Sequence, residues 1–292
     1  MWLHECYIIA KVKRPDIMTS TRRFGLVPAA GQGTRISPLP MSKELYPIGF
    51  QTISDRPGLR PKVVCQYLLE KMRNAGITDA FLILRPGKWD IPAYLGDGAQ
   101  LGMHLAYLTV HVPFGVPFSL NQAYPFIRDA QVVIGFPDIL FTPDHAYQSL
   151  IDRQQYTQAD VVLGLFPTDQ PHQVGVVDFD ETGRVFSIIE KSPTTTLKYM
   201  WAIALWQPSF TQFLHRFVNV HLQRYLGGQP PQTLQELPHP PEIPIGDVIQ
   251  AAIENGLQVE AEVFEDGSYF DIGTPDNLIQ AIHQFGQALQ PE

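Results

Sequence analysis

The sequence predicts an α/β fold in which a Rossmann-like, mixed and mainly parallel sheet is flanked by helices. Two observations support this prediction. Through the first half of the chain, short apolar runs alternate with segments of helical apolar spacing, the pattern of βαβ units. In addition, 45% of the 292 residues are apolar, which is enough to cover a sheet on both faces.

The first half of the chain supplies the parallel strands. We expect strands at residues 24–27, 78–84, 104–110 and 131–136, and helices at residues 63–74, 120–127 and 145–156. The helix at 63–74 ends before Ala75 and Gly76, a good stop signal. Ligands of such sheets bind beyond the carboxyl ends of the strands, so we look for the functional residues there.

The second half has a different pattern and predicts a more antiparallel arrangement. Close-spaced strands are expected at residues 159–166, 174–179, 185–190 and 199–206, with a hairpin turn at residues 180–183. The proline-rich segment 229–244 is interpreted as an exposed loop before a helix at residues 245–255. Near the end, Thr274 and Pro275 have the residue types of a helix N-cap and first helical position.

The stretch from Pro28 to Pro47 carries the strongest functional signal. Gly31 and Gly33 follow the first predicted strand, and their lack of a Cβ lets backbone N–H groups approach a phosphate. Arg35 and Lys43 add a planar and a compact positive group. The dinucleotide-binding and P-loop fingerprints both fail here, because the third glycine and the Lys-Ser/Thr pair are missing.

Composition limits the possible partners. The net charge of −8 argues against nonspecific nucleic-acid binding, and no apolar run reaches the length needed to cross a membrane. Cys6 and Cys65 are the only cysteines, which suggests a reducing cytoplasmic location. An acidic protein that binds a triphosphate must concentrate its cations locally or use a metal.

The longer pattern AAGQGTRxxPxxxSKELYPI resembles the signature loop of the sugar-phosphate nucleotidyltransferases. The resemblance covers residues 24–285 and implies the glycosyltransferase-A-like fold of that family. Within it we expect a nucleotide-binding part (24–158) and a sugar-phosphate-binding part with C-terminal helices (159–285). Outside it we expect a poorly ordered N-terminal extension (1–23) and a tail (286–292).

The resemblance also assigns roles to residues. It implies that Mg2+ is held by Asp138, after the strand at 131–136, and by Asp271 in the YFDIGT segment, a set of oxygen ligands that suits this ion. Arg35, Lys43 and Lys191 would be the catalytic cations. The nucleotide would contact Ala30, Gly31, Gly33, Thr34, Ser119 and Gln122, and the sugar phosphate would contact Gly175, Glu190 and Lys191.

Three departures from the family pattern leave alternatives open. Ser119 stands at a family glycine, Val174 replaces an aromatic residue, and Ser192 replaces a proline; His111 is a possible substitute for a base-binding glutamine. Each single residue also has an ordinary structural interpretation, such as a turn-capping aspartate or a surface Glu–Lys pair.

The expected reaction joins a nucleoside triphosphate to a sugar 1-phosphate and releases pyrophosphate, a step of nucleotide-sugar biosynthesis. The resemblance favours dTTP and glucose 1-phosphate, with UTP as the alternative nucleotide. A regulatory homologue that binds a nucleotide sugar without catalysis is the alternative from another class. Family members often self-associate, so a homo-oligomer is a further expectation.

Overall fold

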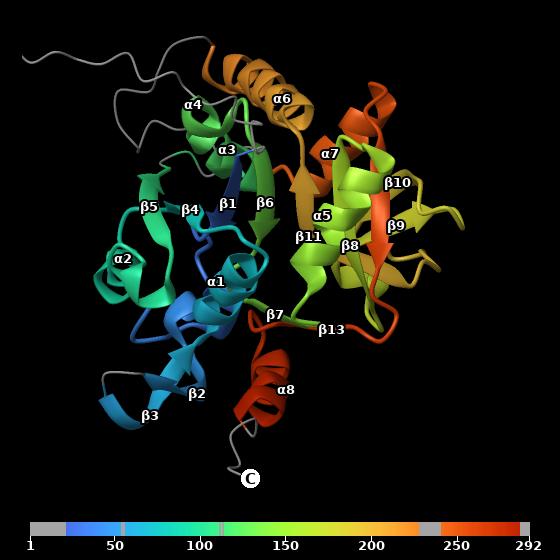
Figure 1. The fold of residues 1–292 in the computed structure, drawn as a ribbon. Coiled ribbons are helices and arrows are strands. Elements are labelled where there is room, and N and C mark those ends of the chain that lie inside the picture. The colour runs from blue at the N-terminus through green and yellow to red at the C-terminus, as the bar shows by residue number, and fades with distance from the viewer. Residues whose placement is uncertain (1–21, 54–55, 111, 113, 228–240, 287–292) are drawn as a thin grey trace, which may run out of the picture.

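The computed structural model describes residues 22–53, 56–110, 112, 114–227 and 241–286 (Figure 1). Residues 1–21 of the expected extension, His111, most of the proline-rich segment and residues 287–292 lie outside these ranges. Arg23, which the sequence assigned to the extension, already belongs to the first strand.

A nine-stranded mixed sheet forms the centre of the molecule. Its parallel half has the order β6–β1–β4–β5. These strands are β1 (Arg23–Pro28), β4 (Asp79–Leu84), β5 (His104–Thr109) and β6 (Gln131–Gly135). All four match strands predicted from the sequence. β6 is buried along its whole length, as expected of a strand covered on both faces.

The other half of the sheet is largely antiparallel, as the second half of the sequence predicts. β11 (Tyr199–Trp206) pairs antiparallel with β6 and continues the sheet to β8 (Val161–Pro167) and β9 (Gly175–Phe179). The predicted hairpin joins β9 to β10 (Val185–Glu190), and β12 (Val259–Val263) pairs parallel with β8.

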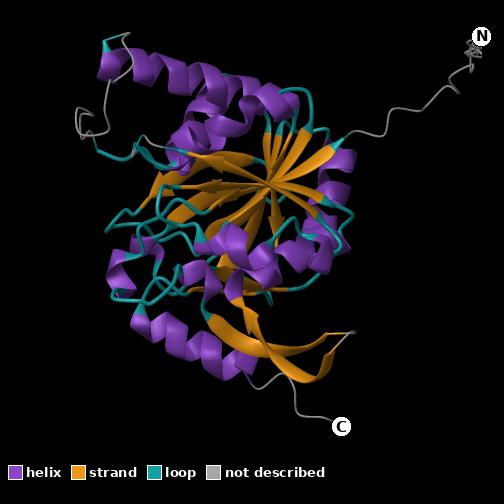
Figure 2. Ribbon diagram, turned by 90° about the vertical axis from the view of Figure 1, so that its left-hand side faces the viewer, coloured by secondary structure: helices purple, strands orange, loops and turns teal. Residues whose placement is uncertain are grey.

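Helices cover both faces of the sheet (Figure 2). One hydrophobic cluster joins the sheet to α1 (Val64–Asn74) and α5 (Ala146–Thr157). A second cluster joins it to α3 (Val116–Leu120), α6 (Pro208–Leu226) and α7 (Ile245–Glu254). Successive β1 residues divide between the clusters: Leu26 packs into the second and Val27 into the first. The short helices α2 (Asp90–Leu95) and α4 (Tyr124–Ile127) complete the parallel half. In the described ranges, no helix is both long and apolar enough to cross a membrane.

Several elements were not foreseen from the sequence. The 19-residue α6 is one, and the projecting hairpin of β2 (Pro47–Ile53) and β3 (Arg56–Val63) is another. A two-stranded ribbon of β7 (Ile139–Thr142) and β13 (Ser268–Asp271) connects distant parts of the chain. α8 (Pro275–Gly286) follows β13, and the predicted cap is present, since Asn277 N–H donates to Thr274 Oγ1 at 3.4 Å.

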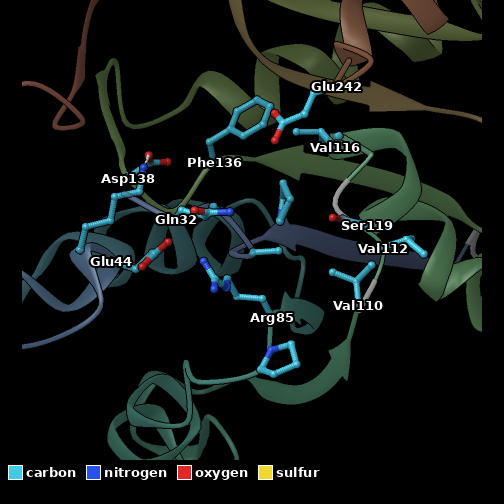
Figure 3. A pocket seen from close by; sticks show the side chains of 16 residues that line it. Gln32, Glu44, Arg85, Val110, Val112, Val116, Ser119, Phe136, Asp138 and Glu242 are labelled. Carbon is cyan, nitrogen blue, oxygen red and sulfur yellow. Dashed lines mark hydrogen bonds and ion pairs between the residues drawn. The ribbon is translucent and has the colours of Figure 1, made fainter. Parts of the chain in front are cut away.

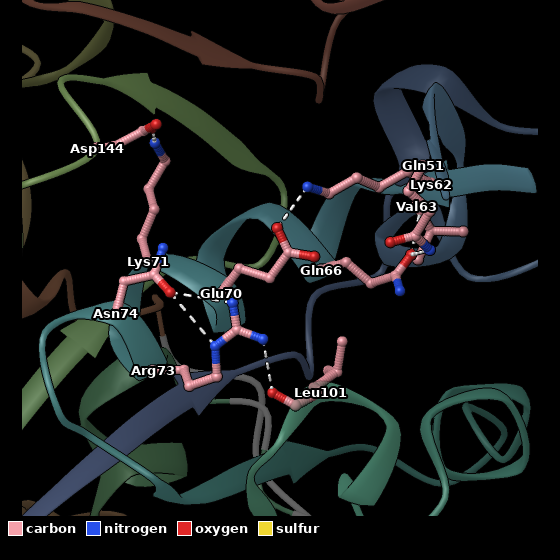
Figure 4. Close-up of polar contacts among 10 residues, drawn as sticks. All are labelled: Gln51, Lys62, Val63, Gln66, Glu70, Lys71, Arg73, Asn74, Leu101 and Asp144. Atoms are coloured by element: carbon pink, nitrogen blue, oxygen red, sulfur yellow. Dashed lines mark hydrogen bonds and ion pairs between the residues drawn. The ribbon is translucent and has the colours of Figure 1, made fainter. Parts of the chain in front are cut away.

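Polar contacts fix α1 to its surroundings (Figure 4). Gln66 Oε1 accepts the Val63 N–H at 2.9 Å and thereby satisfies a donor at the start of the helix. Near the helix end, Arg73 donates to the Leu101 carbonyl at 3.0 Å. Between them, Lys71 forms an ion pair with Asp144, which precedes α5. The helix that follows the β2–β3 hairpin is therefore held at both ends.

Gly135 gives a test of the packing beneath the strand ends. A Cβ at this position would overlap the Tyr147 hydroxyl and a Leu68 methyl group, so Gly135→Ala should lower the free energy of unfolding by about 1–3 kcal/mol. Urea denaturation measures the change. Gly31→Ala is the matched control, because no described atom lies within 4 Å of its added Cβ. Equal stability of the Gly135 variant and the wild type would contradict this packing.

Candidate functional site

A cavity of about 390 Å3 lies at the carboxyl ends of the four parallel strands (Figure 3). Each strand is followed by a segment that contributes to the wall, so the cavity occurs where the α/β rule predicts it. The wall residues are Pro28 at the end of β1, Ala30, Gly31 and Gln32 after it, Arg85 and Pro86 after β4, Val110, Val112 and Gly115 after β5, and Phe136 and Asp138 after β6. Lys43, Glu44, Val116, Ser119 and Glu242 complete it.

The glycine loop after β1 has the openness expected of an anion site. An added Cβ at Gly31 would meet no described atom within 4 Å, and Gly33 has a positive φ of 66° that favours glycine. Ala30 and Gly31 line the first cavity, and Gly33 lines a second one beside it. Thr34 is exposed in a short 3-10 helix (Thr34–Ile36) and lines neither cavity.

Lys43 forms an ion pair with Asp138 at the cavity wall. Only 12% and 16% of the two side chains are exposed, so the pair is well shielded from water. Burial acts to lower the pKa of Lys43, but the charge and hydrogen bond of Asp138, together with the charges of Glu44 and Asp271, outweigh it, so the pKa lies above its usual value. Lys43 therefore stays charged, and its charge is balanced by one of the two predicted metal ligands.

Asp271 reaches the same region through the β7–β13 ribbon. Asp271 pairs with Ile139, and the next residue, Ile272, donates its N–H to the Asp138 carbonyl at 3.1 Å. The two predicted ligands thus come from backbones joined by a hydrogen bond, although 133 residues separate them in the sequence. Arg35 Nη2 lies 3.2 Å from Asp271 Oδ2. This second pair is much more open, with side-chain exposures of 61% and 31%.

The predicted sugar-phosphate residues form a separate group at the end of β10. Glu190 fits between two glycines: a Cβ on Gly175 would lie 2.6 Å from its Oε1, and one on Gly246 would overlap it. Burial raises the pKa of Glu190, with a further contribution from the Asp247 charge. Lys191 follows with a φ of 47°, a left-handed conformation that costs a non-glycine residue roughly 1–3 kcal/mol. Such strain is found mostly where a side chain must be aimed for function.

Aromatic residues connect this group to the main cavity. Trp201 Nε1 would lie 3.1 Å from a Cβ on Gly175, and the Trp201 ring is 6.0 Å from the Phe136 ring, which lines the cavity. The segment before α7 makes a second connection, because Glu242 lines the cavity while Gly246 lies against Glu190.

The two residues predicted to contact the base, Ser119 and Gln122, have different environments in the structure. Ser119 is buried and lines the cavity, whereas Gln122 is exposed, lines neither cavity and is 3.5 Å from the Phe118 carbonyl. Gly115 was not singled out from the sequence, yet it lines the cavity with a φ of 108°. A Cβ there would overlap the Ile243 carbonyl, so the glycine lets residues 241–244 close over the cavity.

Sequence reasoning also missed a buried ion pair in the wall. Glu44 and Lys88 are 2% and 8% exposed, and their charged atoms lie 2.5 Å apart. Burial raises the pKa of Glu44 despite the nearby Lys88 charge. The second carboxylate oxygen of Glu44 has no hydrogen-bond partner among the described residues. The sequence did contain a signal, since Arg85 and Lys88 follow a predicted strand directly, as Asp138 does.

The donor set at the cavity suits a metal that takes most ligands from its substrate. Within the described part of the chain, no group of three or more His, Cys, Asp or Glu residues is arranged to hold a metal ion. Asp138 lines the first cavity, whereas Asp271 lines neither cavity and is brought beside Asp138 by the β7–β13 ribbon. Two carboxylates are the usual protein contribution to a Mg2+ site.

The fold and the site define an α/β protein with an open glycine loop beside a cavity at its strand ends. The nucleotidyl transferase family model matches residues 24–226, which is more than half of the chain. The chain therefore belongs to the nucleotidyl transferase family, within the sugar-phosphate branch that the resemblance indicated.

Several related proteins match most of this chain at low sequence identity. The chain is 25% identical over 262 residues to a low-salt glycan biosynthesis nucleotidyltransferase of Haloferax volcanii, covering 88% of the chain and 64% of the relative. It is 26% identical to a glucose-1-phosphate thymidylyltransferase of Streptomyces antibioticus, covering 91% of the chain and 67% of the relative. It is also 27% identical to a glucose-1-phosphate thymidylyltransferase of Mycolicibacterium smegmatis, covering 88% of the chain and 80% of the relative. The chain thus spans less than two thirds of the first relative's length.

A solved structure supports the fold. A Bacillus anthracis protein, assigned as a glucose-1-phosphate thymidylyltransferase and crystallised with sucrose, matches with a TM-score of 0.70. The match covers 92% of this chain and 98% of that one at 20% identity. The predicted fold class is confirmed.

The environment of Glu190 predicts a pH-dependent stability difference. Because the pKa of Glu190 is raised in the folded state, its ionisation disfavours folding as the pH rises through that pKa. Glu190→Gln cannot ionise, so the variant should gain stability relative to the wild type between pH 4 and pH 7. Urea titrations across this range measure the gain, with the exposed Glu181→Gln as the reference. A difference that shrinks as the pH rises would contradict the burial of this carboxylate.

Proposed function

We propose that the protein joins a nucleoside triphosphate to a sugar 1-phosphate and releases pyrophosphate. The observation that carries this proposal is that the glycine loop and the Lys43–Asp138 pair line one cavity at the strand ends, with the Arg35–Asp271 pair beside it. An open backbone loop, two cations and two carboxylates together suit a substrate with several phosphate charges. Membership of the nucleotidyl transferase family and the names of the relatives support the same reaction.

We assign the roles of the residues from the family resemblance together with their positions. The backbone of residues 31–34 would contact the phosphates, with Arg35 and Lys43 balancing the charge of the leaving pyrophosphate. Lys191 and Glu190 would hold the phosphate and the hydroxyls of the sugar. A sugar-phosphate oxygen then attacks the α-phosphorus, the bond to the β-phosphate breaks, and its electrons leave with pyrophosphate. No protein nucleophile is needed, because positioning and charge neutralisation provide the catalysis.

Asp138 and Asp271 would hold Mg2+, which when bound spreads the negative charge of the phosphates. Both carboxylates already face a cation in the structure, and we propose that each gives up this cation when it binds the metal. When an ion pair separates in this way, its carboxylate becomes available to the metal and its cation becomes available to a phosphate. Metal and triphosphate should therefore favour each other's binding.

The two ion pairs differ in how easily they separate. The exposed Arg35–Asp271 pair contributes about 1 kcal/mol or less, so its separation costs little. Leaving Lys43 without a partner would cost roughly 3–5 kcal/mol, because the Lys43–Asp138 pair is shielded from water. We therefore expect the Lys43–Asp138 pair to separate only when Mg2+ and the triphosphate bind together.

For the substrates we favour dTTP and glucose 1-phosphate, with UTP as the alternative nucleotide. The resemblance of the C-terminal YFDIGT segment to thymidylyl enzymes supports dTTP, as do the names of several relatives. The valines at positions 110, 112 and 116, with Ser119, offer a mainly apolar wall for a base.

A panel of triphosphates tests this function. With glucose 1-phosphate and Mg2+, the wild type should release pyrophosphate fastest with dTTP and next fastest with UTP, and more slowly with ATP, CTP and GTP. A coupled pyrophosphate assay gives the rates. If no triphosphate supports release with glucose 1-phosphate or other sugar 1-phosphates, the regulatory interpretation replaces the enzymatic one.

If the Lys43–Asp138 pair must separate for the triphosphate to bind, Asp138→Asn should change turnover and metal-free nucleotide affinity in opposite directions. Turnover should fall roughly a hundredfold or more, but the variant should bind dTTP more tightly than the wild type when Mg2+ is absent, because Lys43 is already free. Calorimetry and steady-state kinetics measure the two effects.

Matched variants separate this effect from a loss of folding. Asp271→Asn breaks only the exposed pair, so it should lower turnover with little change in metal-free affinity or in melting temperature. Asp129→Asn is the control, since its partner Arg128 is exposed and lines neither cavity. Weaker metal-free binding of dTTP by a folded Asp138→Asn protein would rule out the separation of the Lys43–Asp138 pair.

A further inference from the structure

Two cavities meet beside the glycine loop and share four wall residues. The first cavity extends from Asp138 and Glu44 toward Ser119, as Figure 3 shows. The second is lined by Gly33, Ser42, Lys88 and Asp90, among others. Gln32, Lys43, Arg85 and Pro86 line both. A ligand long enough to occupy both cavities must pass these four residues.

Three cations border the second cavity, and two of them already have acidic partners. Lys43 pairs with Asp138, and Lys88 pairs with Glu44. Arg85, the third, forms no ion pair and no side-chain hydrogen bond with any residue that the structure describes. Of these three cations, Arg85 is therefore the one without an ion-pair partner in the described part of the chain.

The location of Arg85 makes an unbalanced charge costly. Its side chain is half-buried, and Figure 3 shows the guanidinium directed into the cavity, toward Gln32 and Glu44 and away from Ser119. A charge that is partly removed from water and lacks a partner raises the free energy of the protein unless an anion compensates for it. The planar guanidinium fork matches the oxygens of a phosphate group in two parallel hydrogen bonds.

We propose that Arg85 binds the β- and γ-phosphates of the nucleotide, which occupy the second cavity, and stabilises the leaving pyrophosphate. This role rests on the proposed function and adds to it a catalytic residue and the place of the leaving group. As the bond between the α-phosphorus and the bridging oxygen breaks, its electrons pass to pyrophosphate. Arg85 then faces the group that gains negative charge, which is where a fixed cation accelerates the reaction.

The arrangement of the two walls favours phosphates over a base as the partner of Arg85. The valines and Ser119 that suit a base line only the first cavity. The second cavity contains Gly33, whose left-handed φ belongs to the phosphate-binding loop, and Ser42, whose backbone and hydroxyl both donate to Asp90. These donations lower the pKa of Asp90 against the opposing effect of burial, so this carboxylate is already satisfied within the protein.

Arg85→Gln tests the proposal by calorimetry with three probes: dTTP, dTMP and inorganic pyrophosphate, each with Mg2+. A lost charged hydrogen bond should weaken the binding of dTTP and pyrophosphate about tenfold or more, and leave the Kd of dTMP within about twofold. Arg85→Lys should recover part of the affinity, because it keeps the charge but loses the fork. Arg128→Gln is the matched control, since its side chain is exposed and lines neither cavity.

The outcomes distinguish this role from the proposed function. Equal losses for dTMP and dTTP would overturn the proposal and assign Arg85 to the nucleoside. Unchanged pyrophosphate binding in Arg85→Gln, or no pyrophosphate binding by the wild type, would overturn it as well. If pyrophosphate binding depends on Arg85 but the wild type turns over no triphosphate, the anion site stands and the proposed reaction fails.

Discussion

The structure depends on balancing charge where four parallel strands end. The chain carries a net charge of −8, yet the proposed function gives its candidate site a substrate with several phosphate charges. Asp138 and Asp271 would add to the repulsion if they stood alone, but Lys43 and Arg35 neutralise them. These cations and carboxylates thus form ion pairs beside an open glycine loop. An acidic protein can hold a concentrated set of phosphate-binding cations in this way without a positively charged surface.

The scaffold explains how residues far apart in the sequence form these pairs. The loop after β1 supplies Arg35 and Lys43, and the segment after β6 supplies Asp138. Asp271 comes from the far end of the chain through the β7–β13 ribbon, whose pairing fixes it beside Asp138. The sugar-phosphate group lies on the antiparallel half and is connected through Trp201 and Phe136. In the proposed function, one half of the sheet would position the nucleotide and the other half the sugar phosphate.

The sequence predicted those parts of the molecule that depend on local patterns. The four parallel strands, α1 and the β9–β10 hairpin follow from apolar periodicity and turn residues. The Gly31 loop was predicted from its glycines after the first strand and from the long motif that they begin. Asp138 and Asp271 were predicted as a metal pair from a resemblance at two other segments of the chain. The Lys43–Asp138 pairing was not predicted, because it depends on which side chains meet across the fold. Arg85, Gly115 and Glu44 were missed for a related reason: each is an ordinary residue type whose importance lies in the cavity it lines. Gln122 was predicted to contact the base from its position in a segment that resembles the family, but its side chain is exposed to solvent.

The central claim is that both ion pairs separate when metal and triphosphate bind together. A crystal structure with Mg2+ and a non-hydrolysable dTTP analogue tests it most directly. The account predicts Asp138 and Asp271 on the metal, with Lys43 and Arg35 on phosphate oxygens. A fully occupied nucleotide complex in which Lys43 remains on Asp138 and Arg35 on Asp271 would contradict it.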